Sequence, residues 1–324
     1  MPAPNPNWGD VITTTLENRS GELADNITKN NALLSRLKKR GNVKSVAGGR
    51  SIVQELEYAE NGTFKRYSGY EVLDASPSEI FSAAEFGWSQ AAVGITISGL
   101  EGLQNSGKEA MIDLLDARMK NAERTLLNNI ALDCYSDGSA DGGKQIGGLN
   151  LLVPVSPAAG TVGGINRATP ANAFWRSQIV SRAAVPGAPA NITLAFNQAY
   201  LQTVRGPDHC DLIITDTNFY NAYLGALQPL QRFETSEMAQ AGFTSLKFMN
   251  ADVVLDGGIG GGCPANTAFF LNTNYVYFRP HADRNFVPIG GKRESVNQDA
   301  TVRFIGWAGN MTIANAQLQC RLTA

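Results

Sequence analysis

The stretch from Ser106 to Cys134 is the strongest helix signal in this sequence, and it limits the folds open to the chain. Ser106 and Glu109 have the spacing of a capping box. One stripe of the expected helix is apolar and comprises Met111, Ile112, Leu115, Met119, Ala122, Leu126 and Ile130. At ~1.5 Å per residue the helix is about 40 Å long, which favours a long strut. An ordinary core helix is the alternative that this stretch leaves open.

Residues 50–72 predict an extended β-hairpin, because Asn61-Gly62 lies between two β-rich runs and is typical of a two-residue turn. The expected ladder pairs residues across the two arms: Tyr58 with Lys65, Glu57 with Arg66, Leu56 with Tyr67 and Val53 with Tyr70. Both faces of this ribbon mix apolar and charged side chains, and a lone two-stranded ribbon is marginal in water. We therefore expect it to lie on another copy of the chain, through Leu56, Glu57, Tyr58, Lys65, Arg66 and Tyr67.

Composition argues against several classes of protein. The chain has 27 basic and 29 acidic residues, so it lacks the basic excess of proteins that wrap nucleic acid. Its four cysteines are far apart, which is typical of reduced thiols and not of a metal clip or a small disulfide framework. No run approaches the ~18 apolar residues of a membrane span. The N-terminus also lacks the apolar core of a signal peptide, and we expect a cytoplasmic product.

The N-terminal region predicts an extended arm followed by helix. Residues 1–10 are rich in proline and asparagine, and residues 11–40 predict one or two helices broken near Ser20-Gly21. The helical part ends in Lys38, Lys39 and Arg40 before a glycine, where cations suit the negative end of the helix dipole. This basic triplet is either a solvated helix end or a contact with nucleic acid or an acidic partner.

An α/β block at about residues 145–270 is flanked by strands. Alternating apolar residues at 91–97 predict a half-buried strand. Within the block we expect helices at 190–205, 217–227 and 233–241, and strands at 210–215, 246–249, 253–255 and 268–271. The tail predicts strands at 275–278 and 301–307, a turn at Gly309-Asn310 and a return strand at 311–322. If these strands pack on the long helix, their domain is discontinuous.

Catalytic chemistry is not indicated. The glycine-rich run 256–262 lacks the Gly-Lys-Ser/Thr ending of a phosphate loop and no helix follows it, so we interpret it as a flexible loop. Residues 209–211 (His-Cys-Asp) are adjacent in a strand, where neighbours point to opposite faces. Asp252 and Asp256 flank a strand and leave a metal pair as an alternative. We predict no catalytic residue, cofactor or metal ligand.

Short segments spread over residues 80–324 together resemble a known family. They are 97–101, 105–107, 146–149, 211–215, 219–223, 232–233, 241–243, 246–248, 270–273 and 309–310, with Asn315 and Leu322. In this order they resemble the major capsid proteins of tailed bacteriophages, which have the Johnson capsid fold of the Hong Kong phage type. Each segment is short, and it is their joint order that makes the resemblance.

The resemblance implies an α+β chain in five parts. These are an N-terminal arm (1–45), an E-loop hairpin (46–75), a peripheral domain with the spine helix (76–143), an α/β axial domain (144–271) and the closing strands of the peripheral antiparallel sheet (272–324). It also implies a structural subunit that self-assembles into pentamers and hexamers of an icosahedral shell packaging double-stranded DNA.

The implied location is the virion, after assembly in the host cytoplasm, with no membrane contact. The implied partners are copies of the chain, other virion proteins such as a portal, scaffold or decoration protein, and DNA through weak non-specific contact. Lys38, Lys39 and Arg40 are the candidate interior contact. Two alternatives stay open: an encapsulin-like shell around an enzyme cargo, and an α/β enzyme with a glycine-rich loop at 256–263.

Overall fold

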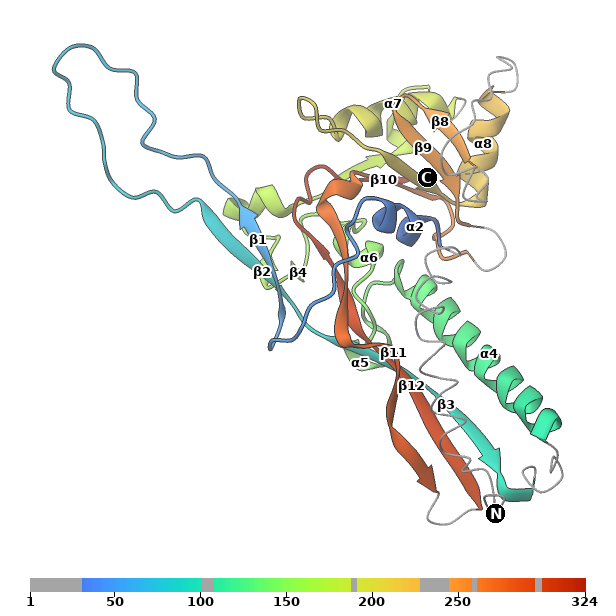
Figure 1. Cartoon of the computed structure of the whole chain (residues 1–324). Helices are drawn as coiled ribbons and strands as arrows, with labels where there is room; N and C mark the ends of the chain where they lie inside the picture. Colours follow the sequence, from blue (N-terminus) through green and yellow to red (C-terminus); the bar gives the residue numbers. More distant parts are fainter. Residues whose placement is uncertain (1–30, 101–107, 188–190, 228–244, 258–260, 295–298) are drawn as a thin grey trace.

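The computed structural model describes residues 31–100, 108–187, 191–227, 245–257, 261–294 and 299–324 (Figure 1). It has a six-stranded sheet, a three-stranded sheet, two short two-stranded ladders and one long projecting loop. The larger sheet has six strands in the order β6-β13-β10-β7-β9-β8. Their bounds are Gln178–Ser181 (β6), Cys320–Thr323 (β13), Thr267–Leu271 (β10), Leu212–Thr215 (β7), Ala251–Leu255 (β9) and Ser245–Phe248 (β8). The sheet is mixed, because β7 runs parallel to β9 and antiparallel to β10.

Both faces of the six-stranded sheet are covered. Successive side chains of a strand point to opposite faces, so Ile213 packs with α7 (Ile192–Gln202) and α8 (Thr217–Leu227). Leu212 and Ile214 pack on the other face, in the core shared with the rest of the molecule. A strand buried on both faces has a continuous apolar sequence, which explains why this strand was predicted correctly.

The long helix is confirmed as α4 (Lys108–Asp133), whose 26 residues span about 39 Å. Four residues of the predicted apolar stripe are buried: Met119, Ala122, Leu126 and Ile130. The helix packs along β3 (Ser89–Ser98), which shows the predicted alternation of buried and exposed residues. Ser106 and the side chains of the first helical turns lie outside the described residues.

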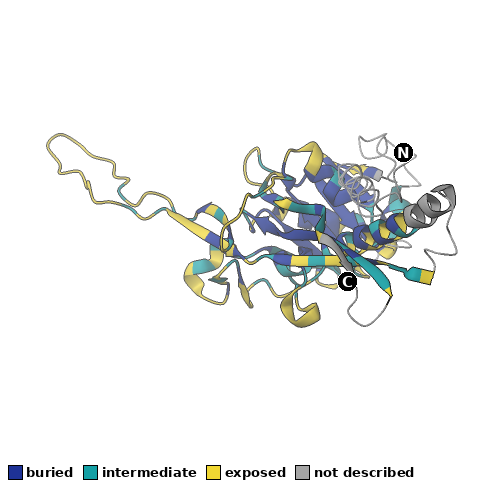
Figure 2. Ribbon diagram, turned by 60° about the horizontal axis from the view of Figure 1, so that its bottom comes forward, coloured by how far each residue is buried: buried dark blue, intermediate teal, exposed yellow. Residues whose placement is uncertain are grey.

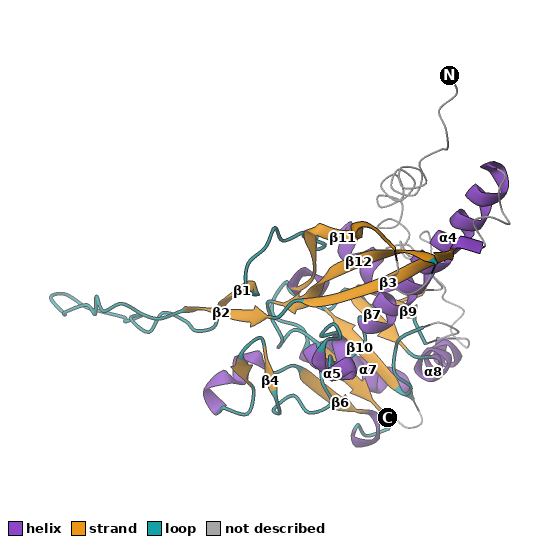
Figure 3. Ribbon diagram, turned by 90° about the horizontal axis from the view of Figure 1, so that it is seen from below, coloured by secondary structure: helices purple, strands orange, loops and turns teal. Residues whose placement is uncertain are grey.

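The smaller sheet has the order β11-β12-β3, with β11 at Val276–Glu294 and β12 at Ala300–Ile313 (Figure 3). The predicted turn at Gly309-Asn310 is wrong, because both residues lie inside β12 and pair with β11. A Cβ at Gly309 would stand 2.6 Å from the Trp307 ring and 2.7 Å from the Arg279 carbonyl oxygen. Because glycine has no side chain, the Trp307 ring and the β11 backbone can both lie close to position 309.

The predicted return strand at 311–322 is also wrong. β12 ends at Ile313, and the last strand, β13, lies in the six-stranded sheet between β10 and β6. The end of the chain therefore belongs to the sheet that the sequence assigned to residues 144–271. The apolar residues near the C-terminus predicted a strand, but they did not show which strands it pairs with.

The N-terminal part of the described chain begins with a capped helix. The Asn31 side chain accepts a hydrogen bond from the Leu34 N–H at the start of α2 (Ala32–Lys39). After Gly41, the chain runs parallel to β11, with bridges from Val43 and Val46. The expected arm at 1–10, the break near residue 20 and the helix at 233–241 lie outside the described residues.

Short helices, strands and turns lie outside the two main sheets. They are α5 (Ala140–Gly143), α6 (Leu149–Leu152), β4 (Thr161–Val162), β5 (Ile165–Asn166) and the 3-10 turns η1 (Pro170–Trp175), η2 (Arg182–Ala184) and η4 (Thr273–Tyr275). A two-stranded ladder of β1 (Ile52–Glu57) and β2 (Phe81–Phe86) leads into the projecting loop. No described helix has the length and apolar character needed to cross a membrane.

Candidate functional site

The loop of residues 58–80 projects far from the body and is exposed along almost its whole length (Figures 1 and 2). All 23 of these residues are described, and they form no helix or strand. The last ladder bond runs from the Tyr58 N–H to the Ile80 carbonyl at 3.0 Å. Beyond it, local side-chain contacts shape the tip, including a Lys65–Glu71 ion pair at 3.2 Å.

The predicted register of this hairpin is wrong, although the projecting hairpin exists. Leu56 lies opposite Ser82 and Glu57 opposite Phe81, so the chain reverses much later than Asn61. The Asn61 side chain instead accepts hydrogen bonds from the Thr63 N–H and hydroxyl at 3.0 and 2.8 Å. This Asx turn bends the chain locally without pairing the flanking runs.

Burial explains the register that the chain adopts. Ile52 lies directly opposite Phe86, and Ala84 lies two residues before Phe86 on the same face of β2. Together with Leu56 they form one buried face, and a shift of one residue would turn that face to solvent. The expected partners Tyr67 and Tyr70 are exposed and could not supply such a face.

The six predicted contact residues lie in different environments. Leu56 is buried in the chain's own core, so we leave it out of the candidate surface. The Tyr58 ring is half-buried and packs against Phe174 at 5.6 Å between centroids. The other four are exposed, and the expected Glu57–Arg66 pairing is wrong because Arg66 lies over the Phe64 ring at 5.4 Å.

The structure adds apolar residues that the predicted contact set lacked. Together with Tyr67, those exposed on the outer loop are Phe64, Tyr70, Val72 and Leu73, and Phe81, the first residue of β2, is also exposed. We call these six residues the loop patch. Phe64 exposes 78% of its surface and Val72 86%, and Tyr70 is fully exposed. The sequence signal was available, since residues 63–73 carry large apolar side chains without the period of a buried strand.

The basic triplet is divided between two environments. Lys38 and Lys39 are exposed at the end of α2. Arg40 instead turns back and donates to Asp211 Oδ2 at 3.1 Å and to Asn274 Oδ1 at 3.2 Å. Arg40 is therefore engaged by the body, although it is exposed like the two lysines.

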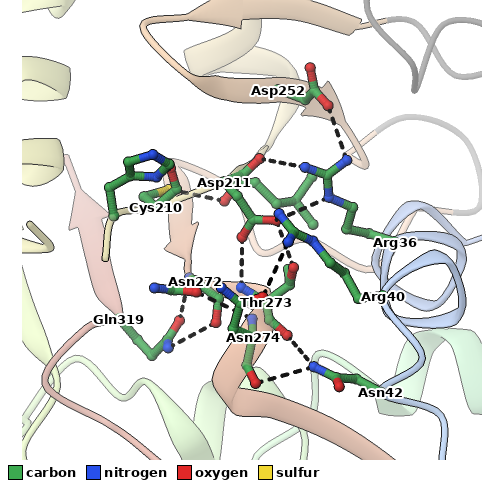
Figure 4. Close-up of polar contacts among 12 residues, drawn as sticks. Arg36, Arg40, Asn42, Cys210, Asp211, Asp252, Asn272, Thr273, Asn274 and Gln319 are labelled. Carbon is green, nitrogen blue, oxygen red and sulfur yellow. Dashed lines mark hydrogen bonds and ion pairs between the residues drawn. The ribbon is translucent and has the colours of Figure 1, made fainter. Parts of the chain in front are cut away.

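Arg40 belongs to a polar cluster that joins α2 to the start of β7 and to the β10–β11 connection (Figure 4). Asp211 is its centre and is almost fully buried. Its carboxylate accepts from Arg36 Nε at 3.0 Å, and from the N–H and hydroxyl of Thr273 at 2.7 Å each. Arg36 also reaches Asp252 Oδ2 at 3.5 Å. We call Arg36, Arg40, Asp211, Asp252 and Thr273 the clamp.

The adjacent His209, Cys210 and Asp211 do not form a catalytic relay. The His209 Nδ1 lies 3.1 Å from the Cys210 carbonyl oxygen, and the Cys210 thiol donates to the Leu212 carbonyl at 3.3 Å. Burial raises the pKa of the Cys210 thiol, which opposes formation of a nucleophilic thiolate. Asp211 is committed to the clamp.

Asp252 and Asp256 bond to different partners and do not form a pair. Asp256 accepts a hydrogen bond from the Tyr135 hydroxyl, and burial raises the pKa of Asp256 to about 6. Asp252 pairs with Arg36. Among the described residues, no group of three His, Cys, Asp or Glu side chains is placed to hold a metal ion.

The described glycines of the 256–262 run are packed closely. A Cβ at Gly261 would lie 2.4 Å from the Asp256 carbonyl oxygen, and one at Gly262 would lie 2.3 Å from the Tyr135 ring. Residues 258–260 lie outside the described residues. These glycines therefore fit a close approach to the body better than the flexible loop that the sequence indicated.

Comparison with known proteins identifies the fold. The chain matches no family model and no curated protein. Among solved structures, the capsid asymmetric unit of cyanophage A-1(L) has a TM-score of 0.56 at 15% identity, covering 87% of this chain and 90% of that chain. The capsid of an empty GTA particle has a TM-score of 0.56 at 13% identity, with 88% of each chain covered.

A structure of Mycobacterium phage Bobi has a TM-score of 0.54 at 9% identity, with 90% of each chain covered. At such low identities the likeness establishes the fold and nothing finer. The expected α+β phage capsid fold is therefore confirmed. An encapsulin-like shell is not favoured by these similarities.

Proposed function

We propose that this chain is the major capsid protein of a tailed bacteriophage. In this role it is a structural subunit without catalytic activity, and it self-assembles into pentamers and hexamers of an icosahedral shell around double-stranded DNA. The observation that carries the proposal is the exposed loop patch on a body with the phage capsid fold. Large exposed apolar patches mark interaction sites.

A second copy of the chain is the partner that suits the loop patch. Fully burying one large apolar side chain contributes roughly 1.5–3 kcal/mol, so burying four of the six patch residues contributes about 6–12 kcal/mol. Ordering those four side chains costs about 2–6 kcal/mol, and the loss of rigid-body freedom, about 4–15 kcal/mol, is offset by the whole interface between the two copies and not by the patch alone. The exposed charges of Glu57, Lys65 and Arg66 would then determine where the loop binds on the second copy.

The interior contacts in this proposal are weak. Lys38, Lys39 and Arg40 are the candidate residues for non-specific contact with packaged DNA, because all three are exposed at a helix end. The Arg40 guanidinium also bonds to Asp211 and Asn274. The proposed location is the virion after assembly in the host cytoplasm, where portal, scaffold or decoration proteins are further partners.

Electron microscopy of the purified protein at increasing concentration tests the proposal. We expect capsomers and closed shells from the intact chain. A variant in which Asn-Gly replaces residues 60–78 should keep β1, β2 and the folded body, as circular dichroism and thermal unfolding would report, but should not form stable shells. An intact chain that remains monomeric, or a shortened loop that assembles normally, would contradict the proposal.

A pair of charge reversals sharpens the test. Arg66→Glu alters an exposed residue of the projecting loop, and Arg205→Glu alters an exposed residue of the body that pairs with Asp208 at 3.5 Å. Exposed pairs are worth about 0–1 kcal/mol, so both variants should unfold almost like the parent. Only Arg66→Glu should weaken assembly, and equal assembly by the two variants would count against the loop as the contact.

A further inference from the structure

We propose that Gly163 is a positioning residue that sets the direction in which the 58–80 loop leaves the body. It lies in a support of residues 160–176, which we call the seat, under the β1–β2 ladder. The proposal depends on the function proposed above, because the direction matters for assembly only if the loop lands on a second copy. The seat itself can be tested on the isolated chain.

The seat meets the ladder through a tight turn. β4 and β5 pair Val162 with Ile165, and the two residues between them, Gly163 and Gly164, both have left-handed backbones with φ of +59° and +77°. This is the geometry of a two-residue type I′ hairpin. The Gly163 carbonyl accepts a hydrogen bond from the Glu85 N–H at 2.9 Å, so the turn lies against the outer edge of β2.

The two glycines differ in their surroundings. A Cβ at position 163 would stand 2.8 Å from the Ala84 Cβ and 3.2 Å from Phe86 Cζ, whereas one at position 164 would have no heavy atom within 4 Å. Carbon atoms in contact lie about 3.5–4.0 Å apart. A side chain at position 163 must therefore push β2 away by about 1 Å, and a side chain at 164 need not.

The seat is held firmly, so β2 is the element that must move. The Trp175 Nε1 donates to the Val162 carbonyl at 2.9 Å. Arg167 is fully buried and donates to the carbonyls of Leu151, Leu152 and Trp175 at 3.2, 2.7 and 2.9 Å. The bonds from Arg167 to Leu151 and Leu152 join the seat to α6, and the other two hold the seat together.

The seat also touches the other arm of the loop. The Phe174 ring packs on Tyr58, the first residue after β1, and the Tyr58 N–H bonds to Ile80 in the opposite arm. Both arms are thus guided where they leave the ladder. Each outer arm of about eleven residues reaches up to about 36 Å, so a tilt of about 5° at the base moves the tip by about 3 Å.

Distance measurement between two spin labels reports the loop direction directly. The labels are placed by Ser68→Cys in the loop and Gln198→Cys on α7, both at exposed positions. The four native cysteines are buried, so the labels react selectively with the new thiols. We expect Gly163→Ala to shift or broaden the distance distribution by about 3 Å, and Gly164→Ala to leave it unchanged.

Ala84→Gly provides the rescue. It removes the atom that a side chain at position 163 would meet, so the double variant Gly163→Ala, Ala84→Gly should return towards the parent distances. In assembly, Gly163→Ala should give fewer closed shells than Gly164→Ala, at similar subunit unfolding temperatures. Identical distances and identical assembly for the two alanine variants would overturn the proposal.

A second variant covers the case in which alanine at position 163 prevents folding. Phe174→Ala removes the contact with Tyr58 without placing a side chain in a left-handed backbone, and it should broaden the label distances. An unchanged distribution in Phe174→Ala would also overturn the proposal. If the parent chain never assembles, the proposed function fails, while the distances still decide whether the seat positions the loop.

Discussion

Replacing either arginine of the clamp by methionine tests how strongly the N-terminal segment is held to the body. Arg36 and Arg40 both donate to the same atom, Asp211 Oδ2, at 3.0 and 3.1 Å. Their side chains are 11% and 40% exposed. Methionine keeps most of the apolar stem and removes the charge, so the two variants compare one interaction at two depths of burial.

The expected losses of stability differ because of this burial. Breaking a buried ion pair costs about 3–5 kcal/mol, since the remaining charge stays desolvated. After Arg36→Met, Thr273 and Arg40 continue to bond to Asp211, whereas the buried Asp252 loses its contact with Arg36, so we expect a cost of about 3–5 kcal/mol. Arg40→Met should cost less than about 1 kcal/mol, because solvent screens the partly exposed pair.

Urea unfolding of the isolated subunit, followed by circular dichroism, measures both costs. A double-mutant cycle with Asp211→Ala should give a large coupling energy with Arg36 and a small one with Arg40. Equal destabilisation by the two methionine variants, or a larger effect from Arg40→Met, would refute the argument from burial.

Three further changes have expected outcomes on stability or reactivity. Burial raises the pKa of Asp256 to about 6 from 3.8, so this carboxyl stabilises the fold below about pH 4 and loses that contribution as the pH rises through about 6. Relative to Asp256→Asn, the free energy of unfolding of the parent should therefore fall by about 2–3 kcal/mol between pH 4 and pH 7, and parallel curves in urea would contradict this. Gly148→Ala should cost about 1–3 kcal/mol, because its Cβ would lie 2.4 Å from the Asp133 carbonyl oxygen, whereas Gly225→Ala in α8 has open space and should stabilise by about 0.5–1 kcal/mol in the same titration. The four buried cysteines should react with a thiol reagent only after denaturant is added, and rapid labelling of the native chain would show that they are accessible.

Elements with a strong local pattern were predictable from the sequence. α4 has a capping signal and an apolar stripe that repeats at helical spacing over many residues, and β3 alternates strictly. β7 is a short apolar run bounded by polar residues. In each case the residues of the element itself determine its secondary structure, and contacts with the rest of the chain do not change it.

The register of the hairpin depends on information that is distant in the sequence. Asn61-Gly62 predicted a chain reversal, but the buried face of β1 needs Ala84 and Phe86, which lie more than twenty residues further along. Gly163, about eighty residues further along, lies against those two residues. A local turn signal cannot compete with an apolar face that must be buried.

The clamp was not predictable for a related reason. The sequence showed Asp211 as a neighbour of His209 and Cys210 and as part of an expected strand, whereas its partner Arg36 is 175 residues away. A buried carboxylate at the start of an apolar strand does indicate a cationic partner, because an unpaired buried charge is costly. The identity of that partner depends on the tertiary fold.

The N-terminal segment fastens three parts of the molecule that the sequence separated into domains. The Asn31 side chain donates to the Ala131 carbonyl of α4 at 3.3 Å, and Arg36 pairs with Asp211 at the six-stranded sheet. Residues 42–46 then extend the edge of β11. Leu56 at the loop base and Phe269 in the six-stranded sheet share one apolar core. Because close-packed interiors transmit displacement, we expect a displacement of the projecting loop to be felt in both the long helix and the six-stranded sheet.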